Sequence, residues 1–343
     1  MPAASSVLLD PFAVVPPVGR ADALAELEDY VDRVLHLSQL QRLGVLYMHV
    51  GAAGALSSDG LYPVLHGVRE LLNSCDEPPT DIATLTTLVT NLLCSARPLA
   101  DTADLDEMLI DDFEEDPTSV TVGVETDEVL RQTLAIASLQ ASTGGSSSAL
   151  IFCTRTEAGR HRVKCAVLAW EPSGAIRVDA PEGAPSCEAT LMVATTPREC
   201  RVSLCTTSLW VRAEGRRPLL YDVVGIAVAA AAAELSPATT PGTLRFGRSF
   251  LEAAKLHGFL HESPKARRLL ATIAEIVYDQ KMGQTHALRV GMGACDPQRS
   301  RTCDGAGAWR RDVDYEYHLH YWRKGRCFEL AWIGVHNDFR CPE

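Results

Sequence analysis

Two neighbouring segments near the end of the chain, DYEYHLHYWR at 314–323 and CFELAWIGVH at 327–336, carry the clearest structural signal in the sequence. Both are rich in aromatic and aliphatic residues, which favour β-strands. Only the short turn Lys324-Gly325-Arg326 separates them. Two such runs joined by a turn that contains glycine predict an antiparallel hairpin.

The first strand of this hairpin is expected to carry two histidines on one face. His318 and His320 are two residues apart, and side chains alternate between the faces of a strand. Tyr321 then takes the other face. His336 closes the second strand, so three imidazoles are expected near one hairpin. Such a group favours an acid–base cluster, whereas a single exposed strand histidine is more often an ordinary surface residue.

The residues before the hairpin predict a small α+β domain. The expected elements are a strand at Leu244–Phe246, a helix at Ser249–Leu256, a helix that starts at Ser263-Pro264 and runs through Gln280, and a strand at His286–Val290. An insertion rich in Gly, Cys and Arg, from Gly291 to about Asp312, separates the last of these from the hairpin.

This order of elements resembles that of the RelE/ParE toxin superfamily. The matching pieces are LRFGRSFLEAAK at 244–255, SPKARRLLATIAEIV at 263–277, HALRVG at 286–291, YEYHLHYW at 315–322 and CFELAWIGVHNDF at 327–339. The resemblance covers about 100 of the 343 residues. Two features depart from the family's pattern. The insertion separates LRVG from the hairpin, and Asn337-Asp338 replaces the basic residue expected at the end of the last strand.

The resemblance implies a metal-independent endoribonuclease that cleaves mRNA and needs no cofactor. Transphosphorylation requires a base for the 2′-hydroxyl, cations that hold the phosphorane and an acid for the 5′-oxygen. The candidate catalytic residues are Arg289 of LRVG as phosphate holder, His318, His320 and His336 as acid–base groups, and Tyr321 and Asp338 as further candidates. As alternatives, Arg289 is a surface ion-pair partner and the hairpin aromatics are packing residues rather than platforms for bases.

The charge pattern places a polyanionic partner in the second part of the chain. Residues 1–150 carry 23 acidic and 6 basic side chains, whereas residues 151–343 carry 21 acidic and 26 basic ones. The net charge of -12 of the whole chain therefore comes from its first part. The candidate nucleic-acid contacts are Lys265, Arg267, Arg268, Arg299, Arg301, Arg310 and Arg311. The four arginines in the insertion are equally compatible with a solvated loop.

The first 240 residues predict two further regions. Residues 1–142 are interpreted as an acidic helical region, in which the acid run Asp101–Asp116 is a solvated face or loop. Residues 148–235 are interpreted as a β-rich domain closed by an Ala-rich helix at 222–235. Its expected strands are Ala149–Thr154, Arg162–Trp170, Ala189–Thr195, Arg201–Thr206 and Ser208–Arg212. Over 144–179 the sequence resembles the NdpA/YejK nucleoid-associated proteins. With residues 243–343 as the third domain, the expected fold class is α+β.

Several features argue against secretion, membrane insertion and metal binding. The start of the chain lacks a cationic segment, and the most apolar window, Val223–Ala233, is about half a membrane span long. The 11 cysteines form no CxxC pair, which favours free thiols in the cytoplasm. Cys295, Cys303, Cys327 and Cys341 are ligand types that zinc accepts, but none has zinc-knuckle spacing, so no metal site is expected.

We therefore expect a cytoplasmic toxin or phage-defence effector. Its C-terminal domain would be the endoribonuclease, and the acidic N-terminal part would regulate that domain in cis. The expected partners are RNA, including ribosome-bound mRNA, and an antitoxin or defence-system protein, without a membrane. The alternative is a non-catalytic binding module, which either inhibits a protein target, as the ParE branch inhibits gyrase, or binds nucleic acid structurally.

Overall fold

The computed structural model describes residues 4–17, 23–63, 68–69, 72–73, 80–99, 101, 105–142, 149–172, 178–179, 186–235, 240–280, 282–291 and 295–343. As expected, the chain is an α+β protein. It forms two compact units, Met1–Leu204 (unit 1) and Cys205–Glu343 (unit 2). The expected boundary near residue 142 is not a boundary between these units.

Unit 1 is built on one mixed sheet. Its strands are β1 (Ser6–Leu9), β2 (Leu46–Met48), β3 (Arg97–Pro98), β4 (Leu105–Asp116), β5 (Ala149–Phe152), β6 (Gly159–Pro172), β7 (Val178–Asp179) and β8 (Ser186–Ala194). They lie in the order β3-β2-β1-β5-β8-β6-β4, with β7 also paired to β6. From β3 through β2, β1 and β5 to β8, each strand is parallel to the next. β6 is antiparallel to both of its neighbours in this order, β8 and β4.

Residues 1–142 contain helices, but the interpretation as a helical region missed the strands β1, β2, β3 and β4. β1 and β2 are almost entirely buried runs of three or four residues, which have no alternation to distinguish them from pieces of helix. The acid run at 105–116 is strand β4. The side chains of Asp111, Asp112 and Glu114 are exposed on it, as expected for a solvated face, whereas the side chain of Glu115 is buried against His161.

Helices complete unit 1. They are α1 (Ala23–Arg42), α2 (Ala52–Ser58), α4 (Ile82–Ser95), α6 (Val124–Ser142) and α7 (Pro197–Ser203), with a short 3-10 helix at Pro11–Val14. A carboxylate from another element caps α6, since Asp59 accepts a 2.7 Å hydrogen bond from the backbone N–H of Thr126. Gly123 permits this contact, because a Cβ there would lie 2.4 Å from the Asp59 carboxylate.

A buried ion pair joins two central strands of unit 1. Asp10 follows β1 and Arg155 follows β5, and two N–O contacts of 2.9 and 3.1 Å join their side chains. Arg155 also contacts Asp127 at the start of α6. Ligands of open α/β sheets usually bind where the strand order reverses, which here is between β1 and β5. In unit 1 this two-contact ion pair occupies that position.

The expected strands at 201–206 and 208–212 are helices instead. α7 starts with a complete capping box, in which Thr196 and Glu199 each bond the other's backbone N–H, and Pro197 occupies its first turn. Residues 206–212 form α8 (Thr206–Arg212). The start signals of α7 precede the first segment in the sequence and outweigh the β-forming side chains that suggested a strand, whereas α8 starts without a side-chain cap.

Unit 2 is built on a five-stranded sheet. Its strands are β9 (Thr243–Phe246), β10 (Thr285–Ala287), β11 (Gly307–Asp312), β12 (Tyr317–Lys324) and β13 (Cys327–Val335), in the order β10-β11-β12-β13-β9. β9 is parallel to β13 and the other pairs are antiparallel. The predicted hairpin is present, with Gly325 at φ 57° in its turn. The insertion is not entirely irregular, because its end forms β11.

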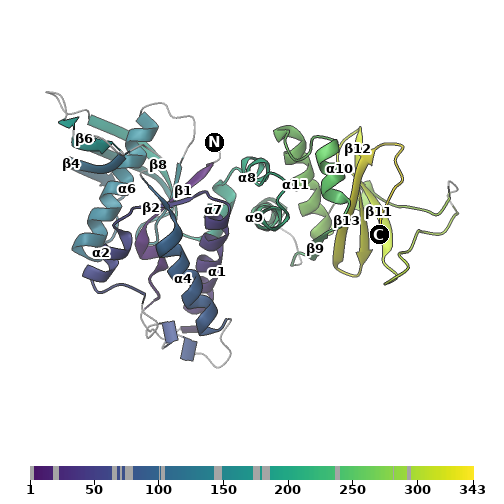
Figure 1. Ribbon diagram of the computed structural model, residues 1–343, viewed down its shortest axis with the longest axis horizontal. Helices are drawn as coiled ribbons and strands as arrows, with labels where there is room; N and C mark the ends of the chain where they lie inside the picture. Colours follow the sequence, from purple (N-terminus) through teal and green to yellow (C-terminus); the bar gives the residue numbers. More distant parts are fainter. Residues whose placement is uncertain are drawn as a thin grey trace. The chain divides into compact units, whose positions relative to one another are not determined.

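The helices of unit 2 are α8, α9 (Arg217–Leu235), α10 (Phe250–Leu256) and α11 (Ser263–Val277). Figure 1 shows α10 and α11 on one face of the sheet, which we call the inner face. The Ala-rich helix α9 belongs here rather than to a β-rich middle domain, since the Tyr278 hydroxyl donates to the Val228 carbonyl at 3.3 Å. Among the described residues no helix is long and apolar enough to cross a membrane.

Candidate acid–base site

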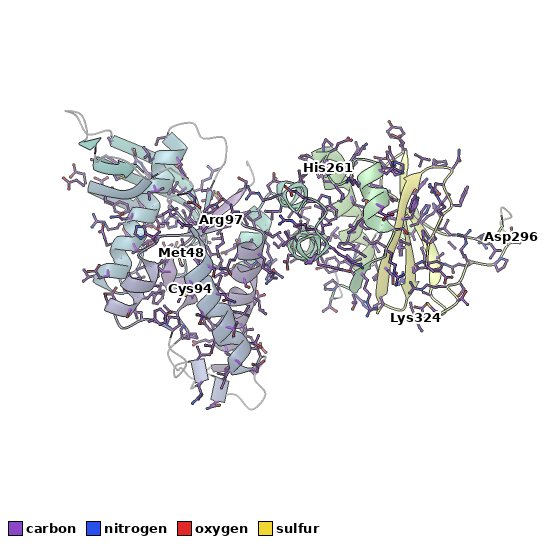
Figure 2. All side chains as sticks on the ribbon, viewed as in Figure 1. Met48, Cys94, Arg97, His261, Asp296 and Lys324 are labelled. Atoms are coloured by element: carbon purple, nitrogen blue, oxygen red, sulfur yellow. The ribbon has the colours of Figure 1, made fainter. Side chains whose placement is uncertain are left out.

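The hairpin histidines lie on the face of the unit 2 sheet opposite α10 and α11, which we call the outer face. His318 and His320 point to it, as predicted, whereas Tyr321 lies buried on the inner face near Phe328. Tyr321 is therefore not beside the histidines. It is a buried packing residue and not a member of the same site. In Figure 2, Lys324 marks the turn at one end of this hairpin; His318 and His336 lie at the other end.

Three side chains from three strands form a continuous chain on the outer face. Asp312 of β11 is directly opposite His318 of β12, and its Oδ1 lies 2.7 Å from His318 Nδ1. His318 Nε2 lies 2.8 Å from Nδ1 of His336, which follows β13. Asp312 is 42% exposed and His318 is buried, while His336 is exposed to solvent. We call this chain the Asp312–His318–His336 relay.

The relay determines which nitrogens carry protons. A carboxylate only accepts hydrogen bonds, so Asp312 favours a proton on His318 Nδ1, although the angle of this contact is poor for a hydrogen bond. Burial lowers the pKa of His318, and the charge of Asp312 only partly opposes that effect. A neutral His318 then accepts at Nε2 from the Nδ1–H of His336. In the tautomer in which His336 donates from Nδ1, its Nε2 is the acceptor nitrogen, which is what a general base requires.

The end of the chain covers the rest of the outer face. His320 is fully buried, and its Nδ1 donates to the carbonyl of Arg340. Burial is the main reason why the pKa of His320 falls to about 4, so it is neutral at pH 7. The Trp322 indole donates to the Pro342 carbonyl at 2.7 Å. His320 is thus a buried anchor for the C-terminal segment rather than a solvent-facing acid or base.

Asp338 lies beside Gly334 on the outer face and is held by three donors, one of which is the backbone N–H of Arg340 at 3.0 Å. It accepts from the Trp332 indole at 2.8 Å and from the Arg340 guanidinium at 2.6 Å. Burial by itself raises the pKa of Asp338, but these hydrogen bonds outweigh it and hold the pKa at about 2. Gly334 makes the arrangement fit, since a Cβ there would lie 2.7 Å from Asp338 Oδ2. The residue that departs from the family's basic pattern therefore has its own cation, Arg340.

Arg289, which the sequence suggested as a phosphate holder, lies away from the relay. Arg289 lies after β10, at the far edge of the sheet, and donates to the backbone carbonyl of Asp296. Arg310 of β11 is instead directly opposite His320 and contributes its charge to the lowered pKa values of His318 and His320, after burial. Two arginines therefore act on the outer face: the charge of Arg310 acts on His318 and His320, and Arg340 pairs with Asp338.

The predicted nucleic-acid contacts separate into surface and structural residues. Arg267 and Arg268 are exposed, and Arg268 pairs with Asp314 at 2.8 Å. Arg311 is fully buried and pairs with Glu275 of α11 at 2.6 Å, so it is a core residue rather than a contact for RNA. Besides Arg310, described above, three more of these residues make contacts within unit 2. Lys265 donates to the His257 carbonyl and Arg299 to the Phe339 carbonyl. Arg301 pairs with Asp304 and Glu329.

Sequence reasoning missed three members of this neighbourhood. Asp312 and Arg340 were not candidates, because β11 was hidden in the insertion and the C-terminal segment has no periodic pattern. His257, after α10, lies 5.3 Å ring to ring from Tyr317, and Asp338 and Arg340 both act on its charge. Burial lowers the pKa of His257. The excess of histidines in the last hundred residues was the one available signal for it.

In the part of the chain that the structure describes, no three His, Cys, Asp or Glu side chains are grouped so that they could hold a metal ion. Comparison of the chain with protein-family models, curated proteins and solved structures finds no match. The interpretation of the site therefore depends on its geometry.

Proposed function

We propose that unit 2 is an endoribonuclease domain that cleaves single-stranded RNA by general acid–base chemistry. The observation that carries the proposal is the Asp312–His318–His336 relay, which ends in an imidazole exposed to solvent. Arg310 and Arg340 lie next to it, and unit 2 carries 19 basic and 15 acidic side chains against 13 and 29 in unit 1. A nucleic-acid substrate therefore suits unit 2 better than unit 1.

The proposed reaction is an attack of the RNA on its own phosphodiester. His336 Nε2 takes the proton of the 2′-hydroxyl, and the 2′-oxygen forms a new bond to phosphorus. The P–O5′ bond breaks, and the 5′-oxygen takes a proton from solvent, leaving a 2′,3′-cyclic phosphate. The proton on His336 is stabilised through His318 by the Asp312 carboxylate, in the way an aspartate supports a catalytic histidine. Arg310 and Arg340 offset the charge on the phosphorane.

The order of elements supports a toxin or defence role for this activity. Strand, two helices and an antiparallel sheet follow one another in unit 2 as in the RelE/ParE superfamily that the sequence resembles, with β11 in the insertion as an addition. RNA on the ribosome, an antitoxin or defence-system partner, and the cytoplasm as location belong to the same proposal. The opposite charge balance of the two units supports regulation in cis by unit 1.

The test is cleavage of a labelled single-stranded RNA by the full-length chain. His336→Ala is expected to slow cleavage by about 10²–10⁴-fold, the usual contribution of a general base. His261→Ala, which changes an exposed histidine between α10 and α11, is the matched control and should cleave normally. RNA with 2′-deoxy nucleotides at the cleavage positions should resist both proteins, and the product should end in a cyclic phosphate.

Two results would overturn the proposal. One is cleavage by His336→Ala at the rate of the unmodified chain, and the other is cleavage of the 2′-deoxy substrate. If the chain binds RNA or a protein target and arrests growth without cleaving RNA, and His336→Ala does the same, the non-catalytic binding module is the correct function.

A further inference from the structure

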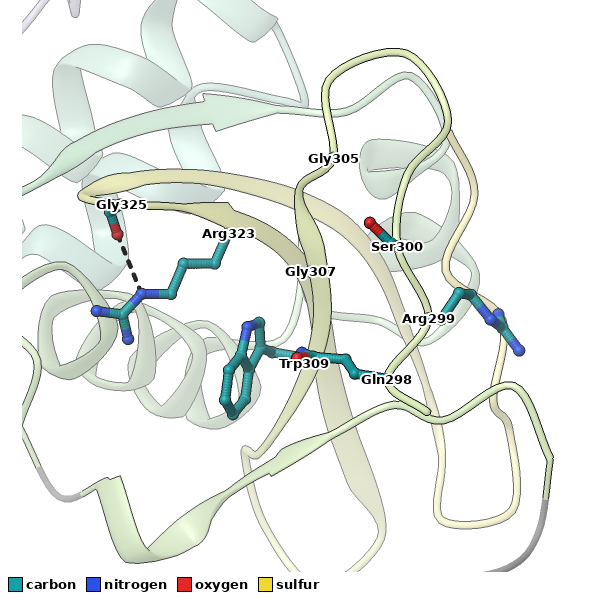
Figure 3. A pocket seen from close by; sticks show the side chains of 8 residues that line it. All are labelled: Gln298, Arg299, Ser300, Gly305, Gly307, Trp309, Arg323 and Gly325. Carbon is teal, nitrogen blue, oxygen red and sulfur yellow. Dashed lines mark hydrogen bonds between the residues drawn. The ribbon is translucent and has the colours of Figure 1, made fainter. Parts of the chain in front are cut away.

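Unit 2 contains a pocket away from the relay. A pocket of about 400 Å³ is lined by Gln298, Arg299, Ser300, Gly305, Gly307, Trp309, Arg323 and Gly325. Figure 3 shows the indole of Trp309 and the side chain of Arg323 on the same side of β11, with Gln298 reaching the strand from the other side. Trp309 and Arg323 lie on the inner face, since Trp309 is opposite the buried Tyr321. The site is thus distinct from the relay on the outer face.

The walls of the pocket are held in place by their own contacts. The Arg323 guanidinium donates to the Gly325 carbonyl at 3.1 Å, pairs with Asp279 at 2.9 Å and lies 5.2 Å from the centre of the Phe328 ring. Its planar group is therefore fixed before any ligand binds. Arg299 lines the pocket too, but its guanidinium donates to Phe339 O, and Figure 3 shows that side chain pointing away.

The remaining wall is an amide held at a fixed distance. The Gln298 side chain donates from Nε2 to the carbonyl of Ala308 at 2.8 Å, which leaves its Oε1 as an acceptor. Gly307 makes this position accessible, because a Cβ there would lie 3.0 Å from Gln298 Nε2. The half-buried indole of Trp309 supplies a flat apolar surface next to this amide.

We propose that this pocket binds a nucleobase. An indole face stacks on any base, a guanidinium adds a cation–π or phosphate contact, and a fixed amide can bond the edge of a base. An apolar ligand would make no hydrogen bond to the guanidinium or the amide, and a bare anion would not stack on the indole. The base comes either from a single strand of RNA or from a free mononucleotide. The proposal does not depend on the relay being catalytic.

Binding to the full-length chain tests the proposal and separates the two sources. The probes are the four nucleoside 5′-monophosphates, a 2′-O-methyl RNA hexamer, which cannot be cleaved by 2′-oxygen attack, and an abasic hexamer with the same backbone. We expect the bases to quench tryptophan fluorescence, and Trp309→Ala to weaken binding about ten-fold or more. Trp309→Tyr should restore much of the affinity, because tyrosine also stacks. Quenching by monophosphates indicates a free nucleotide, whereas quenching by the hexamer alone indicates an RNA strand.

Controls keep the result independent of folding and of catalysis. Arg245→Ala removes an exposed arginine from β9, at the opposite edge of the sheet, and should bind as the unmodified chain does. His261→Ala, which changes an exposed histidine outside both the pocket and the relay, should also bind normally. The proposal is overturned if a folded Trp309→Ala or Gln298→Ala variant binds as tightly as the unmodified chain, if the abasic hexamer binds equally well, or if no probe binds.

Discussion

Nε2 of His318 lies 2.8 Å from Nδ1 of His336, although 18 positions separate the two residues in the chain. The contact joins a buried imidazole to an exposed one, and Asp312 completes it from a third strand. It therefore depends on the register of β11, β12 and β13 together, and its properties can be tested without knowing the substrate.

The first prediction concerns the protons of this contact. In the chain labelled with ¹⁵N-histidine, His318 and His336 should both show the tautomer protonated at Nδ1 at pH 7.5. Asp312→Asn should change the tautomer of His318, because the asparagine amide can donate to His318 Nδ1 and so favour the tautomer protonated at Nε2. The same variant should cleave RNA more slowly, by about 10²-fold or more. Glu316→Gln, which changes an exposed acid on the same hairpin, should alter neither property. An unchanged tautomer in Asp312→Asn would contradict this account.

The second prediction concerns stability and pH. Burial lowers the pKa of His320 to about 4, below the 6.5 of an unfolded histidine, so the unfolded chain binds more protons between these values. Stability should therefore fall as the pH drops from about 6.5 to 4, by roughly 3 kcal/mol from this residue. Urea unfolding followed by tryptophan fluorescence mainly reports unit 2, which holds four of the five tryptophans: Trp210, Trp309, Trp322 and Trp332. Trp170→Phe in both proteins compared below removes the signal of unit 1.

His320→Asn is the variant for this measurement, since its amide keeps a donor for Arg340 O but does not titrate. Its urea midpoint should change less between pH 7 and pH 4.5 than that of the unmodified chain. An equal change in both proteins would assign the pH dependence to other groups.

The third prediction separates two adjacent arginines. Arg311→Met should destabilise unit 2 by about 3 kcal/mol, because it leaves the partly buried Glu275 without its cation. A second change, Glu275→Leu, should recover most of that loss. Arg310→Ala should leave unfolding almost unchanged, but lower RNA affinity and reduce the salt dependence of binding by about one charge. The reverse pattern would show that Arg310, and not Arg311, is the structural residue.

The fourth prediction tests why 197–203 is a helix. Thr196→Ala removes the side-chain cap of α7 and should destabilise this helix by about 1 kcal/mol. Backbone amides of α7 should then exchange hydrogen faster, while those of β8 keep their protection. Thr196→Ser retains the hydroxyl and is the matched control. Equal exchange in the alanine and serine variants would mean that packing alone forms α7.

Local rules predicted much of unit 2 correctly. β-forming residues around Gly325 predicted the hairpin, alternation placed His318 and His320 on one face, and Pro264 marked the start of α11. Each of these signals lies within a few residues of the feature it predicts, and this proximity is why they could be recognised. The capping box at Thr196 was equally local and was overlooked in favour of strand propensity.

The sequence alone determined the α+β class, the hairpin and the face on which its two histidines lie. Only the tertiary structure decided that β1 and β5 are neighbours, that Arg311 is buried while Arg310 is not, and that Asp312 supports His318. These relationships follow from strand pairing and burial between distant segments. A short apolar strand or a charged side chain has the same local sequence whether its partner is water or a residue 36 positions away, as Glu275 is from Arg311.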